Sequence, residues 1–85
     1  MMKLVKNSNY GGFGYGVTEE YKKFVRECED DRTNAKLVEF VENNEDDCGD
    51  LEVVELPDNT TDYLIEDYDG FETVYYVVDG KIHTV

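Results

Sequence analysis

The sequence lacks the features that mark a membrane, secreted or multidomain protein. It has one proline and no serine- or glycine-rich linker, so we draw no internal boundary and expect a single domain over residues 1–85. No apolar run approaches the roughly 18 residues of a membrane-spanning helix. The first ten residues contain no apolar core of a secretion signal. We therefore expect a cytoplasmic protein without contact to a membrane.

Residues for nucleophilic or metal chemistry are scarce as well. Ser8 is the only serine, His83 is the only histidine, and there is no Cys-x-x-Cys pair. A structural zinc site usually needs four Cys or His ligands at short spacing. We therefore expect no enzymatic activity, no bound metal and no cofactor. Cys28 lies on the apolar stripe of a predicted helix, which indicates a buried, inert thiol. Whether it pairs with Cys48 stays open, although the missing secretion signal favours reduced cysteines.

Glycines alternate with aromatic residues between Tyr10 and Gly16. The segment matches neither of the glycine-rich phosphate-binding fingerprints. The helix predicted after it opens with Glu19 and Glu20, which occupy the place where a phosphate would bind. We interpret the segment as a bulged strand or as a loop that lets another backbone approach closely. Base stacking on its aromatic rings would need a positively charged groove, for which this segment has too few basic neighbours.

Positive charge is almost missing from the second half of the chain. The formal net charge is −13, and residues 37–85 contain fifteen Asp and Glu against the single cation Lys81. Such a surface repels nucleic acid and anionic membranes, which argues against direct binding to either. The same half is rich in Val, Leu, Ile and Tyr, so it is not a disordered acidic tail. The negative charge is expected on folded structure.

Two amphipathic helices are predicted in the first half. One begins after the N-cap Thr18, and its apolar residues recur at helical spacing. Its C-terminal end carries an acidic run up to Asp31, where negative charge opposes the helix dipole. A shorter helix is capped by Thr33 and extends to about Asn43.

Five further segments have the residue pattern of β-strands. The predicted strands are 3–6, 51–56, 63–68, 71–78 and 81–85. Asp69-Gly70 and Asp79-Gly80 separate the last three, and Asp-Gly between β-rich runs is a strong hairpin signal. We therefore predict an α+β fold, an antiparallel β-meander of three to five strands with two amphipathic helices packed on one face. Whether the N-terminal strand joins the meander stays open.

Two-residue turns would divide the meander into two faces, whereas a bulge at either glycine would exchange them. One face would carry Leu64, Tyr68, Phe71, Thr73, Tyr75, Val77, Ile82 and Thr84, with Glu66 as its only charge. We expect the helices on this face. The opposite face, with Asp67, Glu72 and the two tyrosines Tyr63 and Tyr76, is then expected to be open and acidic.

The candidate partner-binding residues are the carboxylates of residues 45–72 together with those two tyrosines as anchors. They are Glu45, Asp46, Asp47, Asp50, Tyr63, Asp67, Asp69, Glu72 and Tyr76. A weakly held divalent cation in the acidic loop 45–50 is a third interpretation, behind two kinds of protein binding.

Small size, acidity and the α+β pattern resemble the phage-encoded inhibitors of host defence, namely the anti-CRISPR proteins and other DNA mimics. The run from Tyr63 to Glu72, continued through Asp79-Gly80-Lys81, is similar in character to small phage and prophage proteins. The resemblance covers the overall character of the chain and rests on no motif. It implies a bacterial host and a partner with a basic groove, such as a Cas effector or another nucleic-acid enzyme. The alternative is a non-catalytic interaction or regulatory domain that forms a homodimer through residues 81–85.

Overall fold

The computed structural model describes residues 2–85 and has the predicted α+β fold. Its elements are β1 (Met2–Asn7), α1 (Glu19–Glu27), α2 (Ala35–Asn43), β2 (Leu51–Leu56), β3 (Thr60–Tyr68), β4 (Phe71–Val78) and β5 (Lys81–Thr84). The strands form two antiparallel sheets, the ribbon β1–β2 and the meander β3–β4–β5. The N-terminal strand thus pairs with β2 and does not join the meander.

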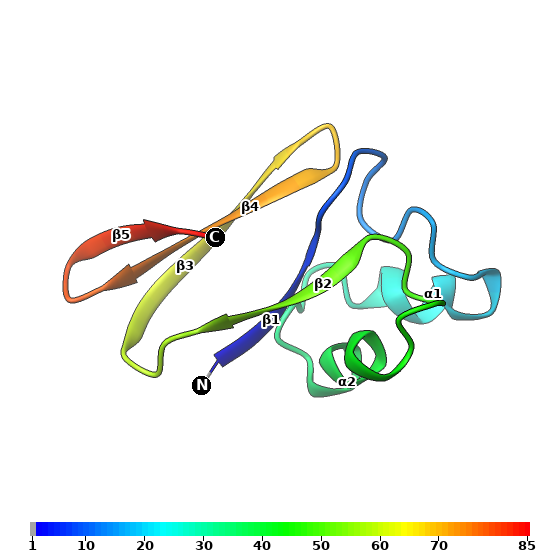
Figure 1. The fold of residues 1–85 in the computed structure, drawn as a ribbon, viewed down its shortest axis with the longest axis horizontal. Helices are drawn as coiled ribbons and strands as arrows, with labels where there is room; N and C mark the ends of the chain where they lie inside the picture. The colour runs from blue at the N-terminus through cyan, green and yellow to red at the C-terminus, as the bar shows by residue number, and fades with distance from the viewer. Residues whose placement is uncertain (1) are drawn as a thin grey trace.

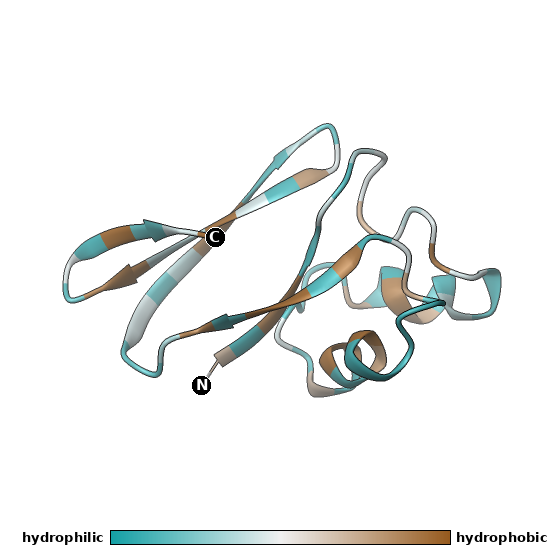
Figure 2. Cartoon of the chain, in the orientation of Figure 1, coloured by the Kyte–Doolittle hydropathy of each residue, from teal (hydrophilic) through white to brown (hydrophobic). Residues whose placement is uncertain are grey.

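The β1–β2 ribbon lies between the helices and the meander (Figure 1). Successive side chains of a strand point to opposite faces. Leu4, Val54 and Leu56 accordingly pack toward the meander, whereas Val5 and Leu51 pack toward the helices. Figure 2 shows the hydrophobic segments of both strands in the middle of the molecule. Burial on both faces explains why apolar residues stand side by side in these strands instead of alternating with polar ones.

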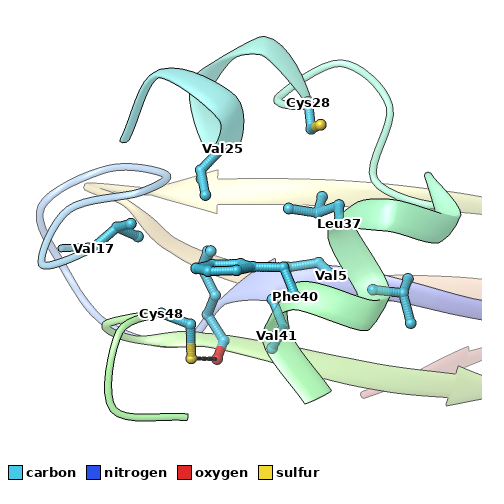
Figure 3. Close-up of a cluster of buried hydrophobic side chains, with 10 residues drawn as sticks. Val5, Val17, Val25, Cys28, Leu37, Phe40, Val41 and Cys48 are labelled. Atoms are coloured by element: carbon cyan, nitrogen blue, oxygen red, sulfur yellow. Dashed lines mark hydrogen bonds between the residues drawn. The ribbon is translucent and has the colours of Figure 1, made fainter. Parts of the chain in front are cut away.

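The helices pack their apolar sides around Phe40 of α2 (Figure 3). The rings of Tyr21 and Phe24 on α1 lie 4.8 and 6.0 Å from the Phe40 ring, measured between centroids. Val25 and Leu37 are completely buried between the two helices and the ribbon. Both predicted amphipathic helices are therefore confirmed. Neither helix of the described residues 2–85 has the length and apolar character needed to cross a membrane.

The helix starts differ in chemistry from the prediction. Thr18 occupies the position before α1 as expected, but its hydroxyl donates a hydrogen bond to Oδ1 of Asp47 at 2.9 Å and does not cap the helix. The cap of α2 is Asn34 and not Thr33, because the Asn34 side chain accepts hydrogen bonds from two backbone N–H groups of the first turn. An asparagine is at least as good an N-cap as a threonine.

The meander has the predicted register. Tyr68 pairs with Phe71 across the first turn, and the second turn likewise joins directly paired residues. Asp69 has φ of 52° and Asp79 has φ of 53°, and the glycine after each also has positive φ. Positive φ at both central residues is what a two-residue type I′ turn requires. Both Asp-Gly hairpins are therefore confirmed.

The predicted position of the helices on the meander is wrong. They cover the ribbon, and the ribbon covers the meander face that carries Val74 and Tyr63. Val74 is completely buried, whereas Leu64 and Ile82 on the opposite face are 63% and 73% exposed. The expected open and covered faces are thus exchanged. The reason is that the ribbon has a second apolar face, which the helices leave free to pack against the meander.

The glycine-rich segment is part of a loop, residues 8–18, that contacts two other backbone turns. A Cβ atom added to Gly70 would collide with the backbone nitrogen of Gly12. One added to Gly49 would lie 2.7 Å from the carbonyl carbon of Gly16. Of the two interpretations of this segment, the loop with close backbone approach is confirmed. The contacts hold the turn after β3 and the loop before β2 against the same segment.

Candidate protein-binding surface

An acidic groove lies where the connection between α1 and α2 meets β3 and β4. Its volume is about 380 Å³. The residues that line it are Glu29, Asp30, Arg32, Tyr63, Leu64, Ile65, Asp67 and Glu72. Four of these side chains are carboxylates and one is a guanidinium. The lining therefore has a negative balance of charge.

An ion pair between Arg32 and Glu72 belongs to the lining of the groove, and the two side chains are 11% and 3% exposed. Both guanidinium ends of Arg32 donate to the Glu72 carboxylate, at 2.7 and 2.8 Å. The backbone N–H of Asn7 donates to the same carboxylate at 2.7 Å. Glu72 is only 3% exposed, and three charge-assisted donors offset the cost of removing it from water. The pair connects the α1–α2 segment to β1 and β4.

Further contacts fix Arg32 in place. Its Nε donates to the carbonyl of Glu29 at 2.6 Å, and its guanidinium lies 3.8 Å from the ring centre of Phe13. The backbone N–H of Val5 donates to its carbonyl at 2.9 Å. Contacts from several segments thus hold the Arg32 side chain. They also fix the position of the turn that contains Glu29 and Asp30.

The rim of the groove combines carboxylates with apolar walls. Glu29, Asp30 and Asp67 are exposed, whereas Tyr63 and Ile65 are half-buried on β3. Oδ1 of Asp67 accepts a hydrogen bond from the backbone of the turn after β3 at 2.6 Å, which orients its carboxylate. Carboxylates beside an aromatic ring suit a Lys or Arg side chain, through charge and through the face of the ring.

Three of the residues predicted to bind a partner meet in this groove, and one of them cannot act as predicted. Tyr63 and Asp67 line it with accessible atoms, whereas Glu72 is buried at 3% exposure. The expectation that Glu72 lies on an open surface is therefore wrong. Its negative charge is neutralised by Arg32, so it positions the groove and is not available to a partner.

The acidic loop before β2 does not line the groove. It contains Glu45, Asp46, Asp47 and Asp50. The loop is tied to the segment 8–18, which bonds to the backbone of Asp47 and Asp50. The same segment bonds to the carbonyl of Asp69 at 2.9 Å. Segment 8–18 therefore links the loop to the turn after β3, but only Tyr63, Asp67 and Glu72 of the predicted set share one groove.

Tyr76 is not among the residues that line the groove. It pairs with Tyr63 across β3 and β4 on the covered face, where both are half-buried against the ribbon cluster. Its ring stacks on His83, with the ring centres 5.3 Å apart and an interplanar angle of 21°. The expectation of an open face bearing both tyrosines is wrong, because the ribbon covers the middle of that face.

Sequence reasoning missed Glu29, Asp30 and Arg32. The first two belong to the acidic run at the C-terminal end of α1, where carboxylates oppose the helix dipole. That unfavourable placement was a usable signal, since residues that weaken a helix often serve another purpose. Nothing local predicts Arg32, because its partner Glu72 is forty residues away in the sequence.

The two cysteines are buried and free. In Figure 3 they lie at different ends of the helix-side cluster, Cys28 beside the end of α1 and Cys48 near β2. Burial raises the pKa of both thiols, and nearby carboxylates raise it further. A raised pKa leaves little thiolate at neutral pH, so neither group is an activated nucleophile.

No group of three or more His, Cys, Asp or Glu side chains within residues 2–85 is arranged to hold a metal ion. The acidic loop 45–50 consequently lacks the ligand cluster that the divalent-cation interpretation requires.

Comparison of the chain with protein-family models, with curated proteins and with solved structures finds no match.

Proposed function

We propose that this chain is a non-catalytic inhibitor whose carboxylates occupy the basic nucleic-acid groove of a protein, such as a Cas effector or another defence nuclease. The density of its surface charge supports the proposal best. The molecule is 41 Å long and has a formal net charge of −13, so it carries one net negative charge for roughly every 3 Å of length. A nucleic-acid strand carries one for about every 3.4 Å. The charge per unit length of the chain is therefore about equal to that of one nucleic-acid strand.

The location of the charge supports the same proposal. Lys6 and Glu72 are the only charged residues of the described range 2–85 that are buried. Nearly all carboxylates are consequently accessible on a folded frame, which loses less conformational freedom on binding than a disordered acidic tail. Complementary charge accelerates association and makes it dependent on salt.

The acidic groove supplies a specific contact within this general attraction. Proteins that hold nucleic acid present Lys and Arg side chains to phosphates. One such side chain would enter between the exposed carboxylates of Asp30 and Asp67 and lie against Tyr63. We expect that contact to orient the chain on its partner, while the other carboxylates contribute to the rate of association.

Competition against single-stranded DNA tests the proposal, with a panel of nucleic-acid enzymes that includes Cas effectors. We expect the protein to displace the DNA from at least one enzyme, with an affinity that falls at least tenfold between 50 and 200 mM salt. The double variant Glu29→Lys/Asp30→Lys should weaken displacement about tenfold or more.

Glu19→Lys/Glu20→Lys serves as the matched control, because it makes the same change of charge at two exposed residues of α1 outside the groove. It should weaken displacement less than the groove variant does. The proposal fails if no enzyme of the panel releases its DNA, or if displacement is equally strong at both salt concentrations.

A homodimer is the second candidate function, favoured by the edge strand β5. Among the described strands it pairs only with β4, and all four of its residues are exposed. An unpaired strand edge is a ready template for a second chain. Sedimentation equilibrium would detect such a dimer, and Ile82→Pro should dissociate it by removing an N–H group from the strand.

A further inference from the structure

Besides the acidic groove, the uncovered side of the meander is a candidate surface for a partner, and we term it the open face. It consists of Asp62, Leu64, Glu66, Tyr68, Phe71, Thr73, Tyr75, Val77, Ile82 and Thr84. Tyr68 and Ile82 are 72% and 73% exposed. Tyr10 extends the face, since its ring lies 5.7 Å from that of Phe71. Figure 2 shows hydrophobic segments of β4 and β5 at the end of the meander far from the helices.

Neither helix of residues 2–85 is available to cover this face. In layered α+β proteins, a sheet buries its apolar face against helices or another sheet. Here α1 and α2 pack on the ribbon, and the ribbon covers the opposite side of the meander. The open face therefore has the composition of a buried surface, but no described element of the chain covers it.

The dimensions of the open face match one α-helix. Eight residues of β4 at about 3.3 Å each give a length of roughly 26 Å, and three strands about 4.8 Å apart give a width of roughly 10–14 Å. A helix is about 10 Å in diameter and rises about 1.5 Å per residue, so about 17 helical residues span the face. Apolar patches of a few hundred Å² or more on a soluble protein commonly mark an interaction site.

The charges of the face determine which helix fits. Asp62 and Glu66 flank Leu64 along β3, and the face contains no Lys or Arg. Two copies of the chain packed through this face would bring like charges together in molecules that each carry −13. A helix whose apolar stripe is bordered by Lys or Arg instead satisfies both the apolar centre and the acidic edge.

We propose that the open face is a docking site for a basic amphipathic α-helix of a partner protein. The apolar side of the helix covers Leu64, Tyr68 and Ile82, and its basic flank meets Asp62 and Glu66. Central apolar anchors with a charged rim are the usual anatomy of a protein interface. This inference deepens the proposed function, because the helix would belong to the same basic partner, but it stands on residues outside the acidic groove apart from Leu64.

A synthetic peptide of 17 residues tests the proposal, with leucines along one side and lysines on both flanks. We expect it to bind and to shift the backbone amide NMR signals of β3, β4 and β5. The double variant Tyr68→Ser/Ile82→Ser should weaken binding at least tenfold, and Glu66→Lys should weaken it several-fold. Circular dichroism checks that each variant remains folded.

Two controls separate docking at the open face from nonspecific binding of the peptide. Tyr15→Ser removes a tyrosine of similar exposure, 65%, outside the open face and should leave peptide binding unchanged. A second peptide with glutamates in place of the lysines should bind at least tenfold more weakly, because it meets carboxylates with carboxylates.

Three results with the peptides or by sedimentation would overturn the inference, and one result of the displacement assay would do so as well. The shifted signals could map to the ribbon or the acidic groove, the glutamate peptide could bind as well as the lysine peptide, or Tyr68→Ser could dissolve a homodimer seen by sedimentation. The displacement assay with Glu29→Lys/Asp30→Lys reports on the proposed function separately. Displacement that is retained by the Tyr68→Ser/Ile82→Ser variant would reject the docking site and keep the proposed function.

Discussion

The two faces of the meander differ in a way that composition does not predict. The covered face contains the carboxylate Glu72 at 3% exposure beside the fully buried Val74, whereas Leu64 and Ile82 of the open face are 63% and 73% exposed. Glu72 is buried because Arg32 and a backbone N–H bond to it. The comparison teaches that a face is covered where the rest of the chain offers complementary groups, even though the other face is also rich in apolar side chains.

The largest expected effect on the free energy of unfolding distinguishes two glutamates, Glu72 on the covered face and Glu66 on the open face. Glu72→Ala leaves the Arg32 guanidinium, on a side chain that is only 11% exposed, without its counter-charge, which should lower the free energy of unfolding by about 3–5 kcal/mol. Glu66→Ala on the open face removes an exposed charge, and we expect a change within about 0.5 kcal/mol. Urea unfolding monitored by circular dichroism measures both. Equal losses in the two variants would contradict the assignment of the faces.

The two Asp-Gly turns provide the next comparison, because one meets the loop 8–18 and the other projects into solvent. Gly70→Ala combines positive φ with a collision against the backbone of that loop, so we expect a loss of about 3 kcal/mol. Gly80→Ala has the same backbone strain but no atom within 4 Å of the new Cβ, so we expect about 1 kcal/mol. Thermal unfolding of both variants decides whether the packing adds to the strain.

Apolar residues on opposite faces give a smaller effect. Val74 is completely buried among the ribbon side chains, and Val74→Ala should cost about 2 kcal/mol through lost contacts and a cavity. Ile82→Ala removes a larger apolar side chain from the open face, yet it should change the free energy of unfolding by at most about 0.5 kcal/mol. A larger loss for Ile82→Ala in urea unfolding would show that the open face is covered.

The smallest effect is a pH dependence that distinguishes the helix side from the meander. Burial raises the pKa of Cys28 and Cys48 above the ordinary value of 9.0 in the folded state. The folded chain then binds more protons than the unfolded chain at alkaline pH, so the thiols' contribution to stability is complete below the unfolded pKa and declines as pH rises through the folded values. Urea unfolding at pH 8 and pH 10 should show a steeper decline for the native chain than for the Cys28→Ala/Cys48→Ala variant.

The structural features that depend on residues close together in the sequence were predictable. The Asp-Gly turns, the register between Tyr68 and Phe71, and both amphipathic helices follow from local backbone preferences and from side-chain periodicity. The groove was only partly predictable. Tyr63 and Asp67 were recognised as candidates, but Glu72 was assigned to the wrong environment because its partner comes from a segment with no sequence relation to β4.

The amino-acid sequence alone determined the kinds of elements, the turn geometry and the excess of carboxylates, because these depend on residues close in the chain or on composition. Only the tertiary structure decided that the N-terminal strand pairs with β2, that the ribbon lies between helices and meander, and that Arg32 meets Glu72. An apolar stripe predicts that a surface will be buried. It does not predict which other surface of the molecule will cover it. That choice depends on which distant surfaces fit one another in shape and which polar groups find partners.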